Sequence, residues 1–257
     1  MIKAIFLDFD GTIFSHKTKK IPDSALKAIL NAQAKGIKIL LSTGRDIAEI
    51  ETFDCRGIKF DGYVLDDGQL LLGKNKKIIE ANYIEGEDKQ KIVNLFKSKK
   101  LPVMIRNLKV GFMNYIDDNT RAAFIDIDSD LPPVKEYNNE DILIATLVTK
   151  DEQERNEMRE LFNNLYITWW HEHSADLLPK NTNKATGILK ILKHLNIALE
   201  DTLAIGDGEN DIEMLKQSKH SVAMGNSIDE VKEIVDYVTT DIDEDGIYNA
   251  FKKYNII

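Results

Sequence analysis

The sequence predicts an α/β protein whose core is a doubly wound, mostly parallel sheet, with a second α/β domain inserted into it. Three observations indicate this fold. Residues 2–79 alternate short apolar strands with amphipathic helices, the order that builds a parallel sheet. The same alternation returns after residue 184. Between these parts, strands outnumber helices and follow one another at hairpin-like spacing, which is typical of an antiparallel sheet.

The first elements are a strand, a helix and a strand. The apolar run at 2–7 predicts a strand, and the helical spacing of apolar residues at 24–35 predicts a helix that begins just after Pro22. The apolar run at 37–41 predicts the next strand. Further along we expect a helix at 47–53, a strand at 63–65, and hairpin strands at 69–72 and 76–79.

The C-terminal part repeats this order. We expect helices at 184–194, 211–217 and 228–235, and strands at 202–205, 221–223 and 237–239. Because both parts alternate in the same way, residues 1–81 and 182–257 are predicted to form one domain.

Residues 82–181 are predicted to form the inserted domain. We expect helices at 88–97, 119–124 and 152–163, and strands at 103–106, 110–115, 143–148, 166–171 and 176–178. This composition favours an antiparallel sheet with helices on one face.

The composition is that of an ordinary soluble globular protein, with 257 residues of which 43% are hydrophobic and 30% charged. A net charge of −9 argues against non-specific nucleic-acid binding, which needs clustered Lys and Arg. The single cysteine, Cys55, allows no intrachain disulfide, and no apolar run suits a signal peptide or a membrane helix. We expect a cytoplasmic protein without a membrane partner, as a monomer or small homo-oligomer.

Two carboxylates follow the first predicted strand, in the stretch DFDGT at 8–12. On an extended backbone, residues two apart point to the same side, so Asp8 and Asp10 are expected to approach one site. Two close carboxylates repel each other unless a cation joins them, and oxygen ligands suit Mg²⁺. The alternative, favoured for such a pair taken alone, is the hydrophilic end of an ordinary strand.

Hydroxyl and ammonium groups provide two further signals. In STGR at 42–45, a small hydroxyl and a free backbone N–H before a helix can bind phosphate, and Thr43 is preferred to Ser42. A simple helix cap is the alternative. Lys184 begins a helix, where its ammonium can lie over a bound phosphate, and Lys180 is the competing candidate. A solvated surface lysine is the favoured explanation when Lys184 is considered alone.

The fourth signal is GDGEND at 206–211, directly after the strand at 202–205. Acids at a helix start are favoured by the helix dipole, which is the ordinary explanation. The glycines indicate more, because they let the backbone approach a ligand closely. Asp207, which comes first after the strand, is expected to reach a metal ion. Asn210 and Asp211, at the start of the following helix, are expected to point toward the same site. In a doubly wound sheet, such strand ends share one crevice, the usual ligand site.

In order and spacing, these four stretches resemble the four motifs of the haloacid dehalogenase superfamily. GDGENDIEML followed by SVAMGNSIDEVKEIVDYVT looks like the Cof-type branch of sugar-phosphate phosphatases. The resemblance covers residues 1–81 and 182–257 and implies a Rossmann-like catalytic core. Residues 82–181 fit the branch's α/β cap by position and length, without a recognisable cap motif.

The resemblance implies a Mg²⁺-dependent phosphatase of small phosphorylated metabolites, sugar phosphates above all. Asp8 would be the nucleophile that becomes an aspartyl-phosphate, and Asp10 would be the general acid and then the general base. Mg²⁺ would bind Asp8, the backbone carbonyl of Asp10, and Asp207. Asp211 would hold this metal site from its second layer of ligands.

The resemblance also implies that Thr43, Lys184 and Asn210 grip the phosphate. The sequence departs from the branch at 66–68, where an Asn-Gly is common and this chain has Asp66-Asp67-Gly68. These acids add negative charge near the junction of core and cap. We expect this charge to restrict which phosphate esters are accepted.

The cap is expected to set specificity, because the core motifs contact only phosphate. If residues 166–171 and their continuation are extended, Trp169, His171 and His173 share a face that could stack on a sugar. The favoured alternative is a tryptophan in the cap core with histidines at its edge. A zinc site is less favoured still, because no third ligand is evident.

Two other functions stay open. A phosphomutase or phosphotransferase on the same core would pass the phosphoryl group to a sugar instead of water. A non-enzymatic phospho-accepting or metabolite-binding protein is the third hypothesis, and Asp10 argues against it because a binder does not need an acid–base group.

Overall fold

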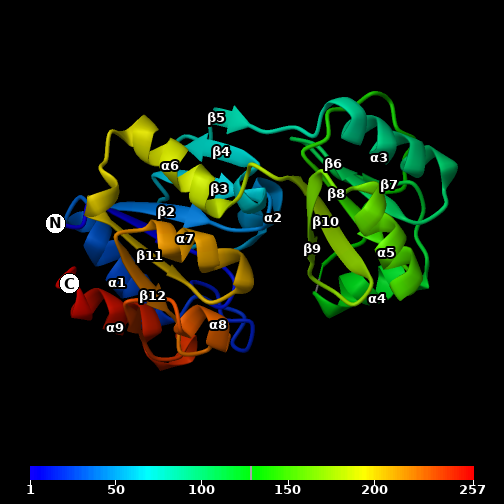
Figure 1. Cartoon of the computed structure of the whole chain (residues 1–257). Helices are drawn as coiled ribbons and strands as arrows, with labels where there is room; N and C mark the ends of the chain where they lie inside the picture. Colours follow the sequence, from blue (N-terminus) through cyan, green and yellow to red (C-terminus); the bar gives the residue numbers. More distant parts are fainter. Residues whose placement is uncertain (128) are drawn as a thin grey trace. The chain divides into compact units, whose positions relative to one another are not determined.

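The computed structural model describes residues 1–127 and 129–257, which divide into two compact units (Figure 1). The first unit comprises residues 1–80 and 182–257, and the second comprises residues 81–181. Within the described residues, no helix combines the length and the apolarity that crossing a bilayer requires.

The first unit is built on an eight-stranded sheet in the order β13-β12-β11-β1-β2-β3-β4-β5. Its strands are β1 (Ala4–Leu7), β2 (Lys38–Ser42), β3 (Gly62–Leu65), β4 (Leu70–Gly73), β5 (Ile78–Ala81), β11 (Thr202–Gly206), β12 (His220–Ala223) and β13 (Tyr237–Val238). All pairs from β13 to β3 are parallel, and β4 runs antiparallel to β3. The predicted doubly wound, mostly parallel sheet is confirmed.

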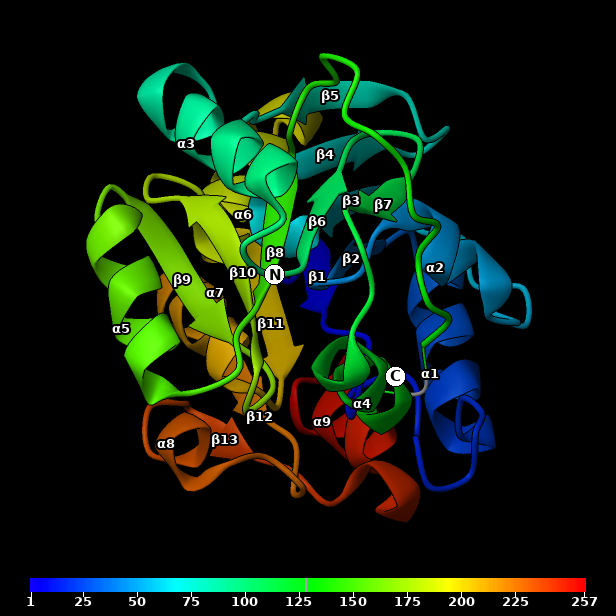
Figure 2. The ribbon, with the colours of Figure 1, turned by 90° about the vertical axis from the view of Figure 1, so that its right-hand side faces the viewer.

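Helices cover both faces of this sheet. They are α1 (Asp23–Ala34), α2 (Ile47–Thr52), α6 (Lys184–Leu195), α7 (Ile212–Gln217), α8 (Asp229–Lys232) and α9 (Gly246–Lys253). Phe6 and its same-face neighbours pack with α6 and α7, and the alternate residues Ile5 and Leu7 are also fully buried. Figure 2 shows α6 and α7 on one side of β1 and β2 and α1 on the other. This double burial explains why the strands are continuous apolar runs.

The second unit contains a five-stranded antiparallel sheet in the order β7-β6-β8-β10-β9. The strands are β6 (Val103–Arg106), β7 (Gly111–Met113), β8 (Ile144–Val148), β9 (Leu165–Trp169) and β10 (Ser174–Pro179), and the helices are α3 (Gly86–Ser98), α4 (Asp118–Asp126) and α5 (Glu152–Leu161). The antiparallel arrangement agrees with the sequence prediction.

The expectation that all helices of this unit lie on one face is wrong for α4. Helices α3 and α5 pack on the face of β6 that presents Val103 and Ile105. Phe124 of α4 instead packs with Met104 from the opposite face. The reason is the period of two in a strand, which turns Met104 away from its neighbours and leaves a second apolar surface to cover.

Several elements differ from the sequence prediction in extent, and one helix is absent from it. The helix predicted at 228–235 is only the short α8, and the strand predicted at 166–171 ends at Trp169. Helix α9 was not predicted at all, although Ile247, Ala250 and Phe251 are buried at helical spacing.

Candidate active site

Three neighbouring strands of the first unit end at the same edge of the sheet, and each is followed by polar residues. β1 lies between β2 and β11 and pairs with both in parallel. Asp8 follows β1, Thr43 follows β2 and Asp207 follows β11. The carboxyl ends of parallel strands therefore bring these three residues together, as the strand order predicts.

Lys184 lies between two of the acids. It is the first residue of α6, whose N-cap Asn183 accepts a hydrogen bond from the backbone N–H of Thr186. Its Nζ donates to Asp8 Oδ1 at 2.8 Å and to Asp211 Oδ1 at 2.7 Å, and its side chain is 0% exposed. The competing Lys180 donates instead to the backbone carbonyl of Asn163 in the second unit.

Asp211 is held on both of its oxygens. Besides Lys184, it accepts hydrogen bonds on Oδ2 from the backbone N–H groups of Asp207, at 2.9 Å, and of Gly208, at 3.1 Å. A Cβ on Gly206 would lie 2.5 Å from the Asp211 carboxylate, so only glycine leaves room for this side chain. The arrangement fixes Asp211 as a rigid support for the turn that carries Asp207.

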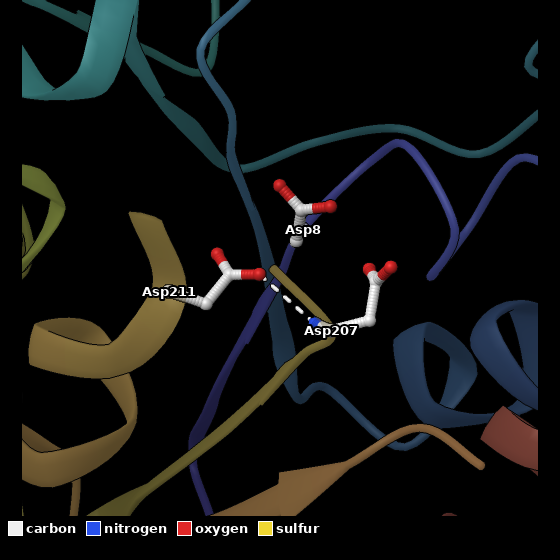
Figure 3. Close-up of side chains that lie close together, drawn as sticks. All are labelled: Asp8, Asp207 and Asp211. Atoms are coloured by element: carbon white, nitrogen blue, oxygen red, sulfur yellow. Dashed lines mark hydrogen bonds between the residues drawn. The ribbon is translucent and has the colours of Figure 1, made fainter. Parts of the chain in front are cut away.

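Three carboxylates of this site come close enough to share one cation. One oxygen each of Asp8, Asp207 and Asp211 lies within 4.8 Å of the others, and Figure 3 shows the three side chains side by side. Thr12 Oγ1 donates to Asp207 Oδ1 at 2.7 Å, which orients that carboxylate. An all-oxygen donor set of this kind fits a hard divalent cation such as Mg²⁺.

The electrostatics of the cluster are unfavourable without a cation. Burial raises the pKa of Asp8 well above its ordinary value, and the charges of Asp211 and Asp207 raise it further, against the opposing effect of Lys184. Burial also raises the pKa of Asp207 to about 7, with Asp211 adding to the shift. Burial disfavours the charged form of Lys184, but Asp211 and Asp8 outweigh it, so the pKa of Lys184 is raised.

Asp10 lies outside this trio. β1 ends at Leu7, so Asp8 and Asp10 lie in the segment after the strand, and Asp10 is not among the three carboxylates that come within 4.8 Å of one another. Arg45 holds the Asp10 carboxylate with a fork, through Nε at 2.6 Å and Nη2 at 2.9 Å, and its guanidinium lies over the ring of Phe53. His16 Nε2 lies 2.7 Å from Asp10 Oδ1.

Thr43 and Asn210 each make a hydrogen bond to a residue that lies close to them at this edge of the sheet. Thr43 is buried, and its Oγ1 accepts a hydrogen bond from the backbone N–H of Arg45 at 3.1 Å. Asn210 Nδ2 donates to Asp67 Oδ1 at 3.0 Å. Ser42, the alternative to Thr43, has a buried Oγ without a hydrogen-bond partner among the described residues.

Sequence reasoning missed several side chains of this site. The sequence assigns no role to Arg45, although it belongs to the STGR stretch, or to His16. Asn226 was also missed, although it donates to the backbone carbonyl of Gly11 at 2.9 Å. The sequence does hold a signal for Asn226, because this residue comes shortly after β12, the neighbour of β11 in the sheet.

In the second unit, the tryptophans and histidines of the stretch at 169–173 are half-buried, so neither tryptophan belongs to the buried core. Trp169 is half-buried, with the guanidinium of Arg155 4.2 Å from its ring. Because β9 ends at Trp169, His171 and His173 lie in the following turn rather than along a strand face. His171 Nε2 lies 3.1 Å from Asp126 Oδ2, and no group of three metal ligands forms in the described part of this unit.

Comparison with known proteins gives consistent matches along the chain. Residues 5–251 match the model of haloacid dehalogenase-like hydrolases. In Bacillus subtilis (strain 168), phosphatase YwpJ is 28% identical over 98% of this chain and 99% of that protein. The 5-amino-6-(5-phospho-D-ribitylamino)uracil phosphatase YcsE of the same organism is 27% identical over 98% of this chain and 96% of that protein.

Solved structures agree. The subclass IIB sugar phosphatase BT4131 of this superfamily is 32% identical, with a TM-score of 0.85 over 99% of this chain and 100% of that one. The phosphatase BT1666 from Bacteroides thetaiotaomicron is 29% identical, with a TM-score of 0.89 over 100% of this chain and 96% of that one. The chain therefore belongs to the haloacid dehalogenase-like hydrolases, in their Cof-type branch, and is a phosphatase.

Proposed function

We propose that this phosphatase hydrolyses small phosphorylated metabolites, sugar phosphates above all, with Mg²⁺ and through an aspartyl-phosphate on Asp8. The observation that carries the proposal is the cluster at the sheet edge, where three carboxylates lie within 4.8 Å of one another and Lys184 contacts two of them. Such a cluster is costly for folding alone, and a cation with a phosphate ester would balance its charges.

Asp8 is the proposed nucleophile. It is buried and its Oδ1 accepts from Lys184, which fixes the direction of its carboxylate. In the first step a bond forms between an Asp8 oxygen and phosphorus, and the bond from phosphorus to the leaving oxygen breaks. In the second step a water oxygen bonds to phosphorus and the bond to Asp8 breaks.

Asp10 is the proposed proton carrier between these steps. Its proton passes to the leaving oxygen in the first step, and it takes a proton from the attacking water in the second. Because the Asp10 carboxylate lies outside the carboxylate trio, it can serve this role without serving as a metal ligand through its side chain. Arg45 supports it by holding the carboxylate in one orientation.

The residues present fit a Mg²⁺ site. Asp8 and Asp207 would provide carboxylate oxygens and Asp10 its backbone carbonyl, while Asp211 keeps both oxygens on Lys184 and the backbone. When bound, Mg²⁺ supplies positive charge that offsets the negative charge of the phosphate oxygens. The raised pKa of Asp207 supports this fit, because a cation would favour the charged carboxylate.

Thr43, Lys184 and Asn210 are the proposed phosphate-binding groups. They offer a hydroxyl, an ammonium and an amide beside the carboxylate cluster, which suits the three peripheral oxygens of a phosphate. We assign residues 82–181, the inserted unit, as a cap. This cap would then determine which leaving groups the enzyme accepts. The names of YcsE and BT4131 support small phosphorylated substrates.

A panel of phosphate esters tests the proposal. Purified protein is assayed for phosphate release with Mg²⁺, with EDTA, and with an added sugar as acceptor. We expect Mg²⁺-dependent release and no net transfer to the sugar. Asp8→Asn should remain folded and lose turnover, whereas an active Asp8→Asn protein would exclude this nucleophile. Transfer to the sugar would instead support the phosphotransferase hypothesis.

A further inference from the structure

The turn that follows β12 is attached to the segment that follows β11. The backbone N–H of Met224, the first residue after β12, donates to the carbonyl of Gly206 at 3.1 Å. Further along the turn, the backbone N–H of Ile228 donates to the carbonyl of Asp207 at 3.3 Å. Asn226 lies between these two attachments, so the backbone that carries it is fixed relative to Asp207.

The side chain of Asn226 contacts three other segments of the chain. Its Nδ2 donates to the carbonyl of Gly11 at 2.9 Å, and Asp207 Oδ2 lies 3.4 Å from the same nitrogen. Its Oδ1 accepts a hydrogen bond at 3.0 Å from the backbone N–H of Ile242, which comes after β13. One amide thus joins the loop after β1, the acid after β11 and the segment after β13.

Gly11 is the residue of the loop after β1 that has the greatest backbone freedom. Its φ of 75° is left-handed, which glycine adopts without strain. A hydrogen bond holds the peptide group on each side of it, because its N–H donates to the carbonyl of Phe14 at 3.0 Å and its own carbonyl accepts from Asn226. The first of these peptide groups contains the carbonyl of Asp10, a proposed metal ligand. Without Asn226, the second peptide group would be released, and Gly11 could then change the direction of the Asp10 carbonyl.

The Asp207 carboxylate packs against the same glycine. A Cβ built on Gly11 would lie 2.2 Å from Asp207 Oδ2, so this oxygen occupies the space that any other residue would fill with its side chain. Thr12 Oγ1 donates to Asp207 Oδ1 at 2.7 Å, while Asn226 contacts Oδ2. Of these two donors, Asn226 is the one that also holds the Gly11 carbonyl, so it sets the distance between the loop and the acid.

We propose that Asn226 is a positioning residue of the metal site, which fixes the Asp10 carbonyl relative to the Asp207 carboxylate and thereby makes the site selective for Mg²⁺ over Ca²⁺. The proposal rests on the proposed function, which assigns both of these groups to Mg²⁺. Mg²⁺ needs a nearly ideal octahedron of oxygens at about 2.1 Å, whereas Ca²⁺ accepts irregular sets of oxygens at about 2.3–2.6 Å. A site whose ligands can shift therefore loses more affinity for Mg²⁺ than for Ca²⁺.

Calorimetric titration of the metal-free protein with Mg²⁺ and with Ca²⁺ tests the proposal without an activity assay. For Asn226→Ala we expect the Kd for Mg²⁺ to rise about five- to tenfold, the usual effect of one hydrogen bond, and the Kd for Ca²⁺ to rise about twofold at most. Asn226→Ser, whose shorter side chain still suits a turn, should give the same change and decides the question if the alanine variant does not fold. Unchanged constants, or an equal rise for both ions, overturn the proposal.

Two further variants separate this proposal from the one it rests on. Asp207→Asn should abolish measurable Mg²⁺ binding, and if Mg²⁺ binds to it as before, the metal assignment itself fails. If Asp207→Asn abolishes binding while Asn226→Ala changes neither constant, only the role of Asn226 fails. The matched control is Asn249→Ala, because Asn249 Nδ2 also donates to a backbone carbonyl, that of Glu244 at 3.4 Å, and to Thr240 Oγ1 at 2.9 Å. This control should leave both constants unchanged, and a loss of Mg²⁺ selectivity in it would overturn the specific role of Asn226.

Discussion

Replacing Lys184 by methionine should destabilise the first unit strongly and in a pH-dependent way. The substitution keeps an unbranched side chain that is one atom shorter and removes its charge. It leaves Asp8 and Asp211, whose side chains are 9% and 1% exposed, without the cation that lies 2.8 Å and 2.7 Å from their oxygens. Removing one partner of a buried ion pair costs about 3–5 kcal/mol. This is a large share of the 5–15 kcal/mol by which a domain is typically stable.

The loss should be largest at high pH. The pKa of Asp8 is raised in the folded protein even beside Lys184, and removing Lys184 raises it further. Between the unfolded and folded pKa values the folded state binds a proton that the unfolded state releases, so stability falls as pH rises. For one such proton the slope is about 1.4 kcal/mol per pH unit. The deficit of Lys184→Met in EDTA should therefore shrink as the pH falls from 8 towards 5.

Urea unfolding followed by circular dichroism gives the free energy of each variant. Both tryptophans, Trp169 and Trp170, lie in the second unit, so their fluorescence reports on that unit and serves as an internal control. Lys190→Met in the same helix is the matched variant, because its surface ion pair with Glu80 is worth less than about 1 kcal/mol. A deficit for Lys184→Met below 1 kcal/mol at pH 8, or one that does not change with pH, would refute the reasoning.

Three further predictions concern the same site. Arg45→Lys keeps the charge but loses the two-point hydrogen bonding to Asp10, the proposed acid–base residue. We expect kcat/KM to fall on the order of 10–100-fold for an alkyl phosphate and only a few-fold for p-nitrophenyl phosphate, whose leaving group needs no proton. Arg56→Lys on the surface is the control, and equal losses on both substrates would contradict the role of Arg45. Because the pKa of Asp207 is raised to about 7, the folded protein without metal binds an extra proton below that value, so in EDTA the Tm should fall as the pH rises from 6 to 8. Mg²⁺ should largely abolish that slope, and a Tm in EDTA that stays flat across this range would exclude the effect. Gly206→Ala pushes a Cβ to 2.5 Å from the Asp211 carboxylate and should weaken Mg²⁺ binding in calorimetric titration, whereas unchanged affinity would show that Asp211 does not support the metal site.

The parts of the site that follow from local sequence could be predicted. Asp8, Thr43 and Asp207 each come directly after a strand of four or five mostly apolar residues. Once the runs are taken as neighbouring parallel strands, their ends must meet. The fold and the meeting of these three residues can therefore be predicted from the order of the elements alone.

The rest depends on contacts that no local pattern encodes. Asn210 and Asp67 are 143 residues apart, and their hydrogen bond depends on a left-handed turn that the sequence indicates only by its glycine. The orientation of Asp10 depends on Arg45, 35 residues away. In α4, Phe124 is buried and Ile125 is 74% exposed, so adjacent apolar residues leave the buried face undetermined by sequence.

The order of the strands also has a consequence for the chain during its synthesis. β1 pairs with β11, which is made about 200 residues later, so at 5–20 residues per second Asp8 waits roughly 10–40 s for the strand that brings Asp207. In that interval one edge of β1 is an open strand edge, which is a template for unwanted pairing. The inserted unit is contiguous in the chain and can fold meanwhile. A nascent chain that stops before residue 202 thus carries Asp8, the proposed nucleophile, but no assembled site, so catalytic competence requires translation to pass β11 and Asp207.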